Sequence, residues 1–172
     1  MTILLVPHDP SWAKRFQAEQ AAILDACGSS ISAVHHVGST SIPSVASKPI
    51  IDILAVLTRP EDGVSCIRSL EHLGYEYRGA NGIEGRLYFK KPQAFHIHMY
   101  PADHPDTGRL LRFRDYLRSH PAEAARYQTL KLKLAQQFAM DRSAYAGAKD
   151  DFCAKVDQLA LEVSKKTSGD ME

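Results

Sequence analysis

Apolar residues in the first hundred positions recur in short runs that predict the strands of a sheet. Residues 50–57 are apolar at every position except Asp52, and a strand that is apolar on both faces is typical of the interior of a sheet. Shorter runs predict strands at residues 3–6, 31–37 and 75–78. A carboxylate in the strongest strand is costly to bury without a cation or donors, so Asp52 is a candidate functional residue.

Two later segments alternate between apolar and polar residues and predict a β-hairpin. In residues 86–90 and 95–100 every second side chain is apolar, and the short link at 91–94 suits a tight connection. The polar face of this hairpin gathers Arg86, Tyr88, Lys90, His96, His98 and Tyr100.

The other segments predict helices. We expect a first helix from about residue 9 to 27 and a second from 60 to 73, both ended by glycine. The first has an apolar stripe made of Trp12, Phe16, Ile23 and Leu24. After Pro101 the pattern becomes helical, and the expected helices are 107–119, 121–138 and 143–165.

The order of these elements predicts an α/β (α+β) fold in which a mixed sheet comes first and a helical extension follows. We expect one domain over residues 1–172. Its sheet core takes about residues 1–104 and its helical cap about 105–166, and the tail at 167–172 is expected to be disordered.

Composition restricts the partners and the cellular location. The 172 residues are 44% hydrophobic and 24% charged, with a formal net charge of +1. Since Lys and Arg are scattered, no basic stripe for long nucleic acid is evident, whereas a small phosphorylated ligand remains compatible. The three cysteines have no zinc or disulfide spacing, no apolar run reaches membrane-spanning length, and the start lacks a basic segment of a signal peptide. These features predict a cytoplasmic protein with no membrane partner.

Asp52 belongs to two candidate constellations. A Gly38-Ser39 turn at the end of the strand at 31–37 can bring backbone amides close to phosphate oxygens, although a plain turn is the commoner meaning of Gly-Ser. His96 and His98 point to one face of their strand, and with Asp52 they would make a three-ligand metal site. Surface histidines are the alternative interpretation. Imidazole ligands favour Zn²⁺, Mn²⁺ or Fe²⁺ over Mg²⁺.

Cations and aromatic rings supply further candidates for a phosphate or nucleotide site. Arg86 and Lys90 share the face of the histidines. Ser41 follows the Gly-Ser pair in its loop, and Lys48 lies just before the strongest strand. Two Tyr/Lys pairs have helical i,i+4 spacing and can combine stacking with phosphate contacts, namely Tyr127 with Lys131 and Tyr145 with Lys149. Core tyrosines with partly buried lysines are the alternative. Arg114 and Arg118 indicate first a salt-bridged helix face, with a substrate role secondary.

Several of these motifs together resemble the GrpB-like family, also called the UPF0157 type. The resemblance is carried by residues 36–43 (His-Val-Gly-Ser-Thr-Ser-Ile-Pro), 48–54 (Lys-Pro-Ile-Ile-Asp-Ile-Leu), His96-Ile97-His98, 113–118 (Phe-Arg-Asp-Tyr-Leu-Arg) and the two Tyr/Lys pairs. It covers nearly the whole chain. Where the family reads Pro-Gly-Leu, this chain has Pro43-Ser44-Val45, so Ser44 is expected to strain the turn if a positive φ is needed there.

The resemblance implies the fold of the nucleotidyltransferase superfamily, in which a Gly-Ser loop precedes paired aspartates that hold two Mg²⁺ ions. Gly38, Ser39 and Asp52 match that signature. The second aspartate would fall on Ile50 or Leu54, neither of which ligates metal. The carboxylate set is therefore incomplete, and catalysis is not implied. The family also occurs fused to dephospho-coenzyme A kinase and acetyltransferase domains, which suggests a functional link to coenzyme A metabolism.

Two functions are therefore open, with a third behind them. The leading one is metal-assisted nucleotidyl transfer on a small nucleotide or phosphorylated substrate, with Asp52 as the catalytic residue. The alternative is a non-catalytic module that binds a nucleotide, coenzyme A or a metal ion. Metal-dependent hydrolysis ranks lower because no separate general base is identifiable.

Overall fold

One mixed sheet of five strands organises the chain. The computed structural model describes residues 3–92 and 94–169, with side chains described through residue 166. The strand order in the sheet is β1-β2-β5-β4-β3. The strands are β1 (Ile31–Val37), β2 (Ile51–Leu57), β3 (Glu76–Tyr77), β4 (Leu87–Lys91) and β5 (Phe95–Pro101). The expected mixed sheet with helices is confirmed, and β2 lies in the sheet interior between β1 and β5 as predicted.

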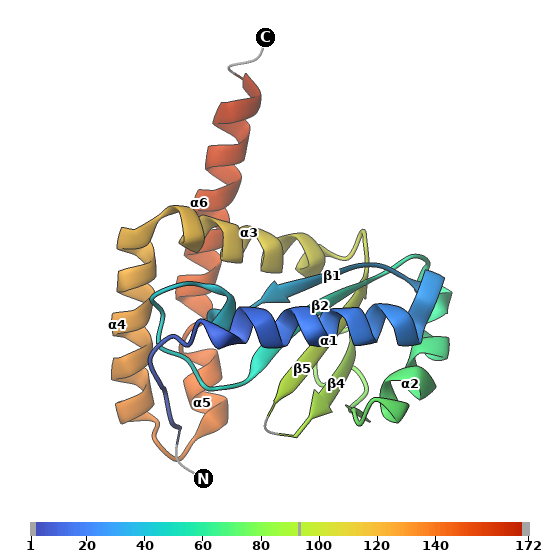
Figure 1. The fold of residues 1–172 in the computed structure, drawn as a ribbon. Coiled ribbons are helices and arrows are strands. Elements are labelled where there is room, and N and C mark those ends of the chain that lie inside the picture. Colours follow the sequence, from blue (N-terminus) through green and yellow to red (C-terminus); the bar gives the residue numbers. More distant parts are fainter. Residues whose placement is uncertain (1–2, 93, 170–172) are drawn as a thin grey trace.

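Helices cover both faces of the sheet and continue beyond it (Figure 1). They are α1 (Ser11–Cys27), α2 (Gly63–His72), α3 (Pro105–Ser119), α4 (Pro121–Gln137), α5 (Arg142–Gly147) and α6 (Asp150–Gly169). Three 3-10 turns are η1 (Gly28–Ser30), η2 (Ser39–Ser41) and η3 (Pro60–Asp62). Helices α4, α5 and α6 stand together at one end of the molecule, and α2 lies at the opposite end (Figure 1). None of the helices in the described ranges is long and apolar enough to cross a membrane.

Strand register decides which side chains share a face. β1 and β5 flank β2, with β1 antiparallel and β5 parallel to it. In this register Val37 lies opposite Asp52, and Asp52 lies beside His96. The predicted hairpin is confirmed, because β4 and β5 are antiparallel and Tyr88 pairs with His98.

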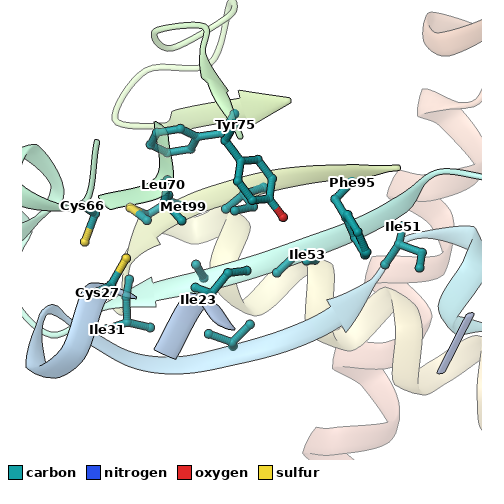
Figure 2. Packing of buried hydrophobic residues seen from close by; sticks show 14 of the residues in the cluster. Ile23, Cys27, Ile31, Ile51, Ile53, Cys66, Leu70, Tyr75, Phe95 and Met99 are labelled. Carbon is teal, nitrogen blue, oxygen red and sulfur yellow. The ribbon is translucent and has the colours of Figure 1, made fainter. Parts of the chain in front are cut away.

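The main hydrophobic core lies between the sheet and helices α1 and α2. Figure 2 shows Ile23 of α1 and Leu70 of α2 packed with residues of three strands, among them Ile53 and Met99. These four side chains have no accessible surface. Burial of this apolar surface stabilises the face of the sheet that points away from Asp52.

The other face of the sheet is covered in part by the C-terminal helices. Leu54 and Tyr100 pack there with Leu110 and Leu111 of α3. A further cluster joins α3, α4 and α6 through Leu117, Tyr127 and Val156. Asp52 and the two histidines lie on this second face, beside the region that α3 covers.

Four details of the sequence prediction are wrong. Residues 3–6 form a single β-bridge between Val6 and Ser47 rather than a strand. Leu24 is 39% exposed and does not belong to the buried stripe of α1. The helix expected at 143–165 is two helices, because the chain leaves helical geometry between Gly147 and Asp150. The tail was expected to be disordered from 167, but α6 continues to Gly169, and residues 170–172 lie outside the described part of the chain.

Candidate functional site

Asp52 and the two histidines converge on one face of the sheet. Oδ1 of Asp52 lies 3.5 Å from Nδ1 of His96 and 3.5 Å from Nε2 of His98. The parallel pairing of β2 with β5 causes this, since His96 is the neighbour of Asp52 in the ladder and His98 follows on the same face. The Asp52 side chain keeps 32% of its surface accessible, so a ligand can reach the carboxylate.

Gly38 is packed directly against this carboxylate. It has φ 68°, in the left-handed region, and a Cβ added there would lie 2.5 Å from Oδ2 of Asp52. Any other residue at this position would both strain the backbone and collide with the aspartate. The glycine therefore allows the loop and the strand to approach each other closely.

The turn η2 after Gly38 is held by its own Ser41 and by side chains from the helical part. The hydroxyl of Ser41 donates to the Gly38 carbonyl at 2.6 Å, and Arg118 Nε donates to the Ser41 carbonyl at 2.8 Å. The Ser39 hydroxyl lies 3.2 Å from the hydroxyl of Tyr127. Ser41 is thus engaged within the turn, whereas Ser39 and Tyr127 face each other near Asp52.

On the histidine side, Tyr88 forms the centre of an aromatic and cationic cluster. Its ring centroid lies 5.6 Å from that of His96 and 5.2 Å from that of His98. The Arg86 guanidinium and the Lys90 ammonium lie over the ring, at 4.7 and 5.5 Å from its centroid. Burial, followed by the charge of Asp52, raises the pKa of Tyr88 to about 12, so its hydroxyl stays protonated near neutral pH.

Arg86 is buried and already engaged. Its Nε and Nη2 donate to the carbonyls of Ala80 and Asn81, and Nη1 lies 3.4 Å from Nδ1 of His98. A guanidinium only donates hydrogen bonds, so Nδ1 of His98 accepts, and a neutral imidazole then carries its proton on Nε2, which faces Asp52. Arg86 positions His98 and the loop before β4, and this contact favours an Asp52–His98 hydrogen bond.

The two histidines also control the charge of Asp52. Burial by itself would raise the pKa of this carboxyl, but the hydrogen bonds and charges of His96 and His98 outweigh it and hold the pKa well below its usual range. Asp52 is therefore an anion at all physiological pH values.

Three lysines and two tyrosines form a second cluster near Asp52. The ammonium groups of Lys149 and Lys48 lie 3.7 and 4.9 Å from the centroid of the buried Tyr145 ring. Lys131 is only 3% exposed, and it donates to the Ala46 carbonyl at 2.6 Å and to the Ser47 hydroxyl at 3.2 Å. Tyr127 and Tyr145 are core residues, while Lys48 and Lys149 are half-buried.

The lysines lower one another's pKa values. Burial, then the charge of Lys149, lowers the pKa of Lys131 to about 7, and burial with Lys48 lowers that of Lys149 to about 8. The pKa of Lys48 is lowered as well, first by burial and then by Arg142. Asp52 opposes the lowering at all three, which places its charge within their reach.

The donor set resembles a metal site without completing one. Nitrogen and oxygen ligands about 2.1 Å from a tetrahedral ion lie roughly 3.4 Å apart, which matches the Asp52–His96 and Asp52–His98 separations of 3.5 Å. Among the described residues, however, no group of three or more His, Cys, Asp or Glu side chains has the arrangement of a metal centre. To ligate a metal through Nε2, His98 would have to carry its proton on Nδ1 instead, and the contact of Nδ1 with the donor Arg86 Nη1 disfavours that tautomer.

Comparison with known proteins establishes the family. The chain matches the family described as GrpB protein over residues 2–159. It belongs to the GrpB family. The UPF0157 protein YqkA of Bacillus subtilis is 38% identical over 164 residues, which are 94% of this chain and 48% of YqkA. The chain thus spans about half the length of that relative.

Solved structures share the fold of the chain. The conserved protein GrpB from Enterococcus faecalis has a TM-score of 0.86 at 36% identity, over 94% of this chain and 99% of that one. Terminal uridylyl transferase 4 from Trypanosoma brucei, with bound UTP and UMP, has a TM-score of 0.53 at 14% identity, over 92% of this chain and 52% of that one. The second likeness is one of fold, and it confirms the predicted nucleotidyltransferase-type architecture.

From the sequence, two residues that belong to the site were not assigned, and backbone strain was anticipated at a third position. Tyr88 was placed on the polar face of the hairpin but not assigned to the site, although the alternation already put it on the same face as the histidines. Ser47, which accepts from Lys131, follows no sequence motif. Ser44 has φ 68°, so the strained turn expected at the missing family glycine is present.

Proposed function

We propose that this GrpB protein binds a nucleotide, or another small phosphorylated ligand, on the sheet face that carries Asp52. The observation that supports this proposal best is the close contact of the Gly38 turn with Asp52. A Gly-Ser turn and an aspartate form part of the nucleotide site in the superfamily whose fold this chain shares. Lys48 and Lys149 would meet phosphate oxygens, because both are half-buried and electrostatically coupled to Asp52. The bound UTP and UMP of the uridylyl transferase support a nucleotide ligand.

The proposed reaction is metal-assisted nucleotidyl transfer. Asp52 and His96 would hold the ion, and His98 would join them through Nε2 in the tautomer that carries its proton on Nδ1, which the contact with Arg86 disfavours. His ligands favour Zn²⁺, Mn²⁺ or Fe²⁺. The ion would supply Lewis-acid stabilisation of negative charge on the phosphate. Tyr88 and Lys90 line the same face, and Arg86 holds His98 in place. This assignment fits a cytoplasmic enzyme.

A second candidate is binding without turnover. At the position two residues after Asp52 on β2, the fully buried Leu54 packs under α3 where a second carboxylate would be needed. The proton of His98 and the contact with Arg86 also favour a hydrogen-bonded site. A ligand such as a nucleotide or coenzyme A would then be held by the lysine cluster alone.

Titration calorimetry with ATP and UTP, in the presence and absence of Mn²⁺, tests the proposed site. We expect Asp52→Asn to weaken Mn²⁺-dependent nucleotide binding at least tenfold, because the carboxylate is the only anionic ligand of the proposed centre. Lys149→Met should weaken binding with or without the metal. The matched control is Asp25→Asn, which removes an exposed carboxylate from α1 on the opposite side of the sheet.

Product analysis separates the reactions. Pyrophosphate release that requires an acceptor supports transfer, and phosphate release in water alone supports hydrolysis. Tight binding with neither product supports the non-catalytic candidate. If wild-type protein binds no nucleotide, or if Asp52→Asn and Lys149→Met bind as tightly as wild type, the proposed site is wrong.

A further inference from the structure

A hollow with a positive charge lies at the outer edge of β1, between α1 and α3. It has a volume of about 320 Å³, and Gln17, Gln20, His35, Arg114 and Arg118 are among its lining residues. The volume is at the lower end of the range for small-molecule sites. β1 is an edge strand, so this hollow is open on the side away from β2 and Asp52.

Two arginines from successive turns of α3 are fixed in this hollow. Arg114 Nη1 donates to the His36 carbonyl at 3.2 Å, and Arg118 Nε donates to the Ser41 carbonyl at 2.8 Å. Gln20 Nε2 donates to the Val34 carbonyl at 2.8 Å. These contacts hold Arg114 against β1 and Arg118 against the turn η2, so little side-chain entropy remains to be lost when a ligand binds.

The positive charge of the two arginines is only partly balanced. Arg114 makes a two-pronged ion pair with Asp115, at 2.7 and 3.0 Å, but that carboxylate is 57% exposed. Within residues 3–92 and 94–169, no carboxylate lies within 4.0 Å of the Arg118 guanidinium, and its terminal nitrogens have no hydrogen-bond partner there. The two arginines also act on the histidines of β1. Burial, followed by the charge of Arg114, lowers the pKa of His35, and burial, followed by the charge of Arg118, lowers the pKa of His36.

We propose that this hollow is a second binding site, which takes a small phosphate-class dianion such as a phosphomonoester. The planar fork of Arg118 suits two phosphate oxygens, and the amides of Gln17 and Gln20 and the imidazole of His35 supply neutral polar partners around it. A dianion would also relieve the repulsion between the two arginines. None of the residues proposed to meet phosphate here is proposed to contact the nucleotide, although Arg118 also holds the turn η2 through the Ser41 carbonyl.

The test measures binding of inorganic phosphate and of glycerol phosphate by NMR chemical-shift titration of the whole chain, at constant ionic strength. We expect both ligands to shift the amide signals of residues 34–36 and 114–118, with the phosphomonoester binding at least as tightly. Arg118→Gln should weaken binding at least tenfold. Arg126→Gln, which removes an exposed arginine paired with Glu123 on α4, should leave it unchanged.

Two further variants keep the outcome decisive. Arg118→Lys retains the positive charge but lacks the planar, two-pronged guanidinium. This variant replaces Arg118→Gln in the test if the glutamine variant fails to fold, and its affinity for phosphate should still fall several-fold. Lys149→Met should leave these shifts unchanged. The proposal is overturned if phosphate shifts no signals at 34–36 and 114–118, if chloride produces the same shifts, if folded Arg118 variants bind as wild type, or if Lys149→Met abolishes the shifts.

Discussion

At the scale of single residues, two positions in the loop from 38 to 44 have the same backbone conformation, but the candidate site requires it at only one of them. Gly38 and Ser44 both have φ 68°. At Gly38 the missing Cβ makes room for Asp52, so the glycine is required by the site. Ser44 has a Cβ in the same unfavourable region, next to a hollow of about 650 Å³ that Asp52 does not line.

Ser44→Gly is therefore expected to stabilise the protein. A non-glycine residue in the left-handed region costs about 1–2 kcal/mol, and the added freedom of glycine in the unfolded chain offsets about 0.4–1 kcal/mol of that. The free energy of unfolding from urea denaturation should rise by roughly 0.5–1 kcal/mol. Ser44→Ala retains the Cβ and should show no gain; a loss of stability in the glycine variant would contradict the strain argument.

At the scale of elements, α1 shows how tertiary packing selects among apolar side chains. Both Ile23 and Leu24 were expected in the buried stripe of this helix. Ile23 has no accessible surface and lies in the core of Figure 2, whereas its neighbour Leu24 is 39% exposed. Adjacent helical positions point about 100° apart, so only one of two consecutive residues can face the centre of the sheet.

This difference predicts unequal effects of two neighbouring truncations. Ile23→Ala should lower the free energy of unfolding by about 2–5 kcal/mol, because it leaves a cavity in a close-packed core. Leu24→Ala should lower it by less than about 1 kcal/mol. Urea denaturation of the two variants provides the measurement, and similar losses for both would show that α1 is rotated from the position described.

At the scale of the whole molecule, the lysine cluster joins segments that are far apart in the chain. Lys48 precedes β2, Lys131 lies on α4, and Lys149 lies in the break between α5 and α6. Burial, followed by repulsion from a neighbouring lysine, lowers the pKa of Lys131 to about 7 and that of Lys149 to about 8. A bound polyphosphate would raise these pKa values again.

Nucleotide binding is consequently expected to weaken as pH rises above about 8. In that range the free protein has lost a lysine proton that the complex retains, so binding takes up a proton, and affinity should fall up to tenfold per pH unit for each such lysine. Calorimetry of ATP binding in two buffers of different ionisation enthalpy at pH 8.5 measures the uptake. Lys149→Met should reduce it, while Lys133→Met, at an exposed position of α4, should not. Equal affinity of wild type from pH 7 to 9.5 would contradict the coupling.

The sequence alone determined what depends on local periodicity. Alternation of period two in residues 86–100 defined the hairpin and its polar face, and the apolar run of 50–57 defined an interior strand with Asp52 as its one charge. The Gly38-Ser39 loop, with the family motifs, was enough to predict the nucleotidyltransferase-type fold. The hairpin and the interior strand follow from neighbours in the chain, because side-chain direction repeats with the local backbone, whereas the fold was implied by the resemblance to the family.

Tertiary structure decided everything that depends on distance across the chain. Parallel pairing of β2 with β5 brings His96 and His98 to Asp52, and no local pattern specifies that register. Only the tertiary structure shows that Arg86 donates to loop carbonyls and contacts His98, and that the buried Lys131 donates to Ser47. The phosphate hollow at Arg118 likewise exists because α3 crosses the edge of β1. Periodicity fixes the direction of a side chain, whereas its partners depend on how the elements pack.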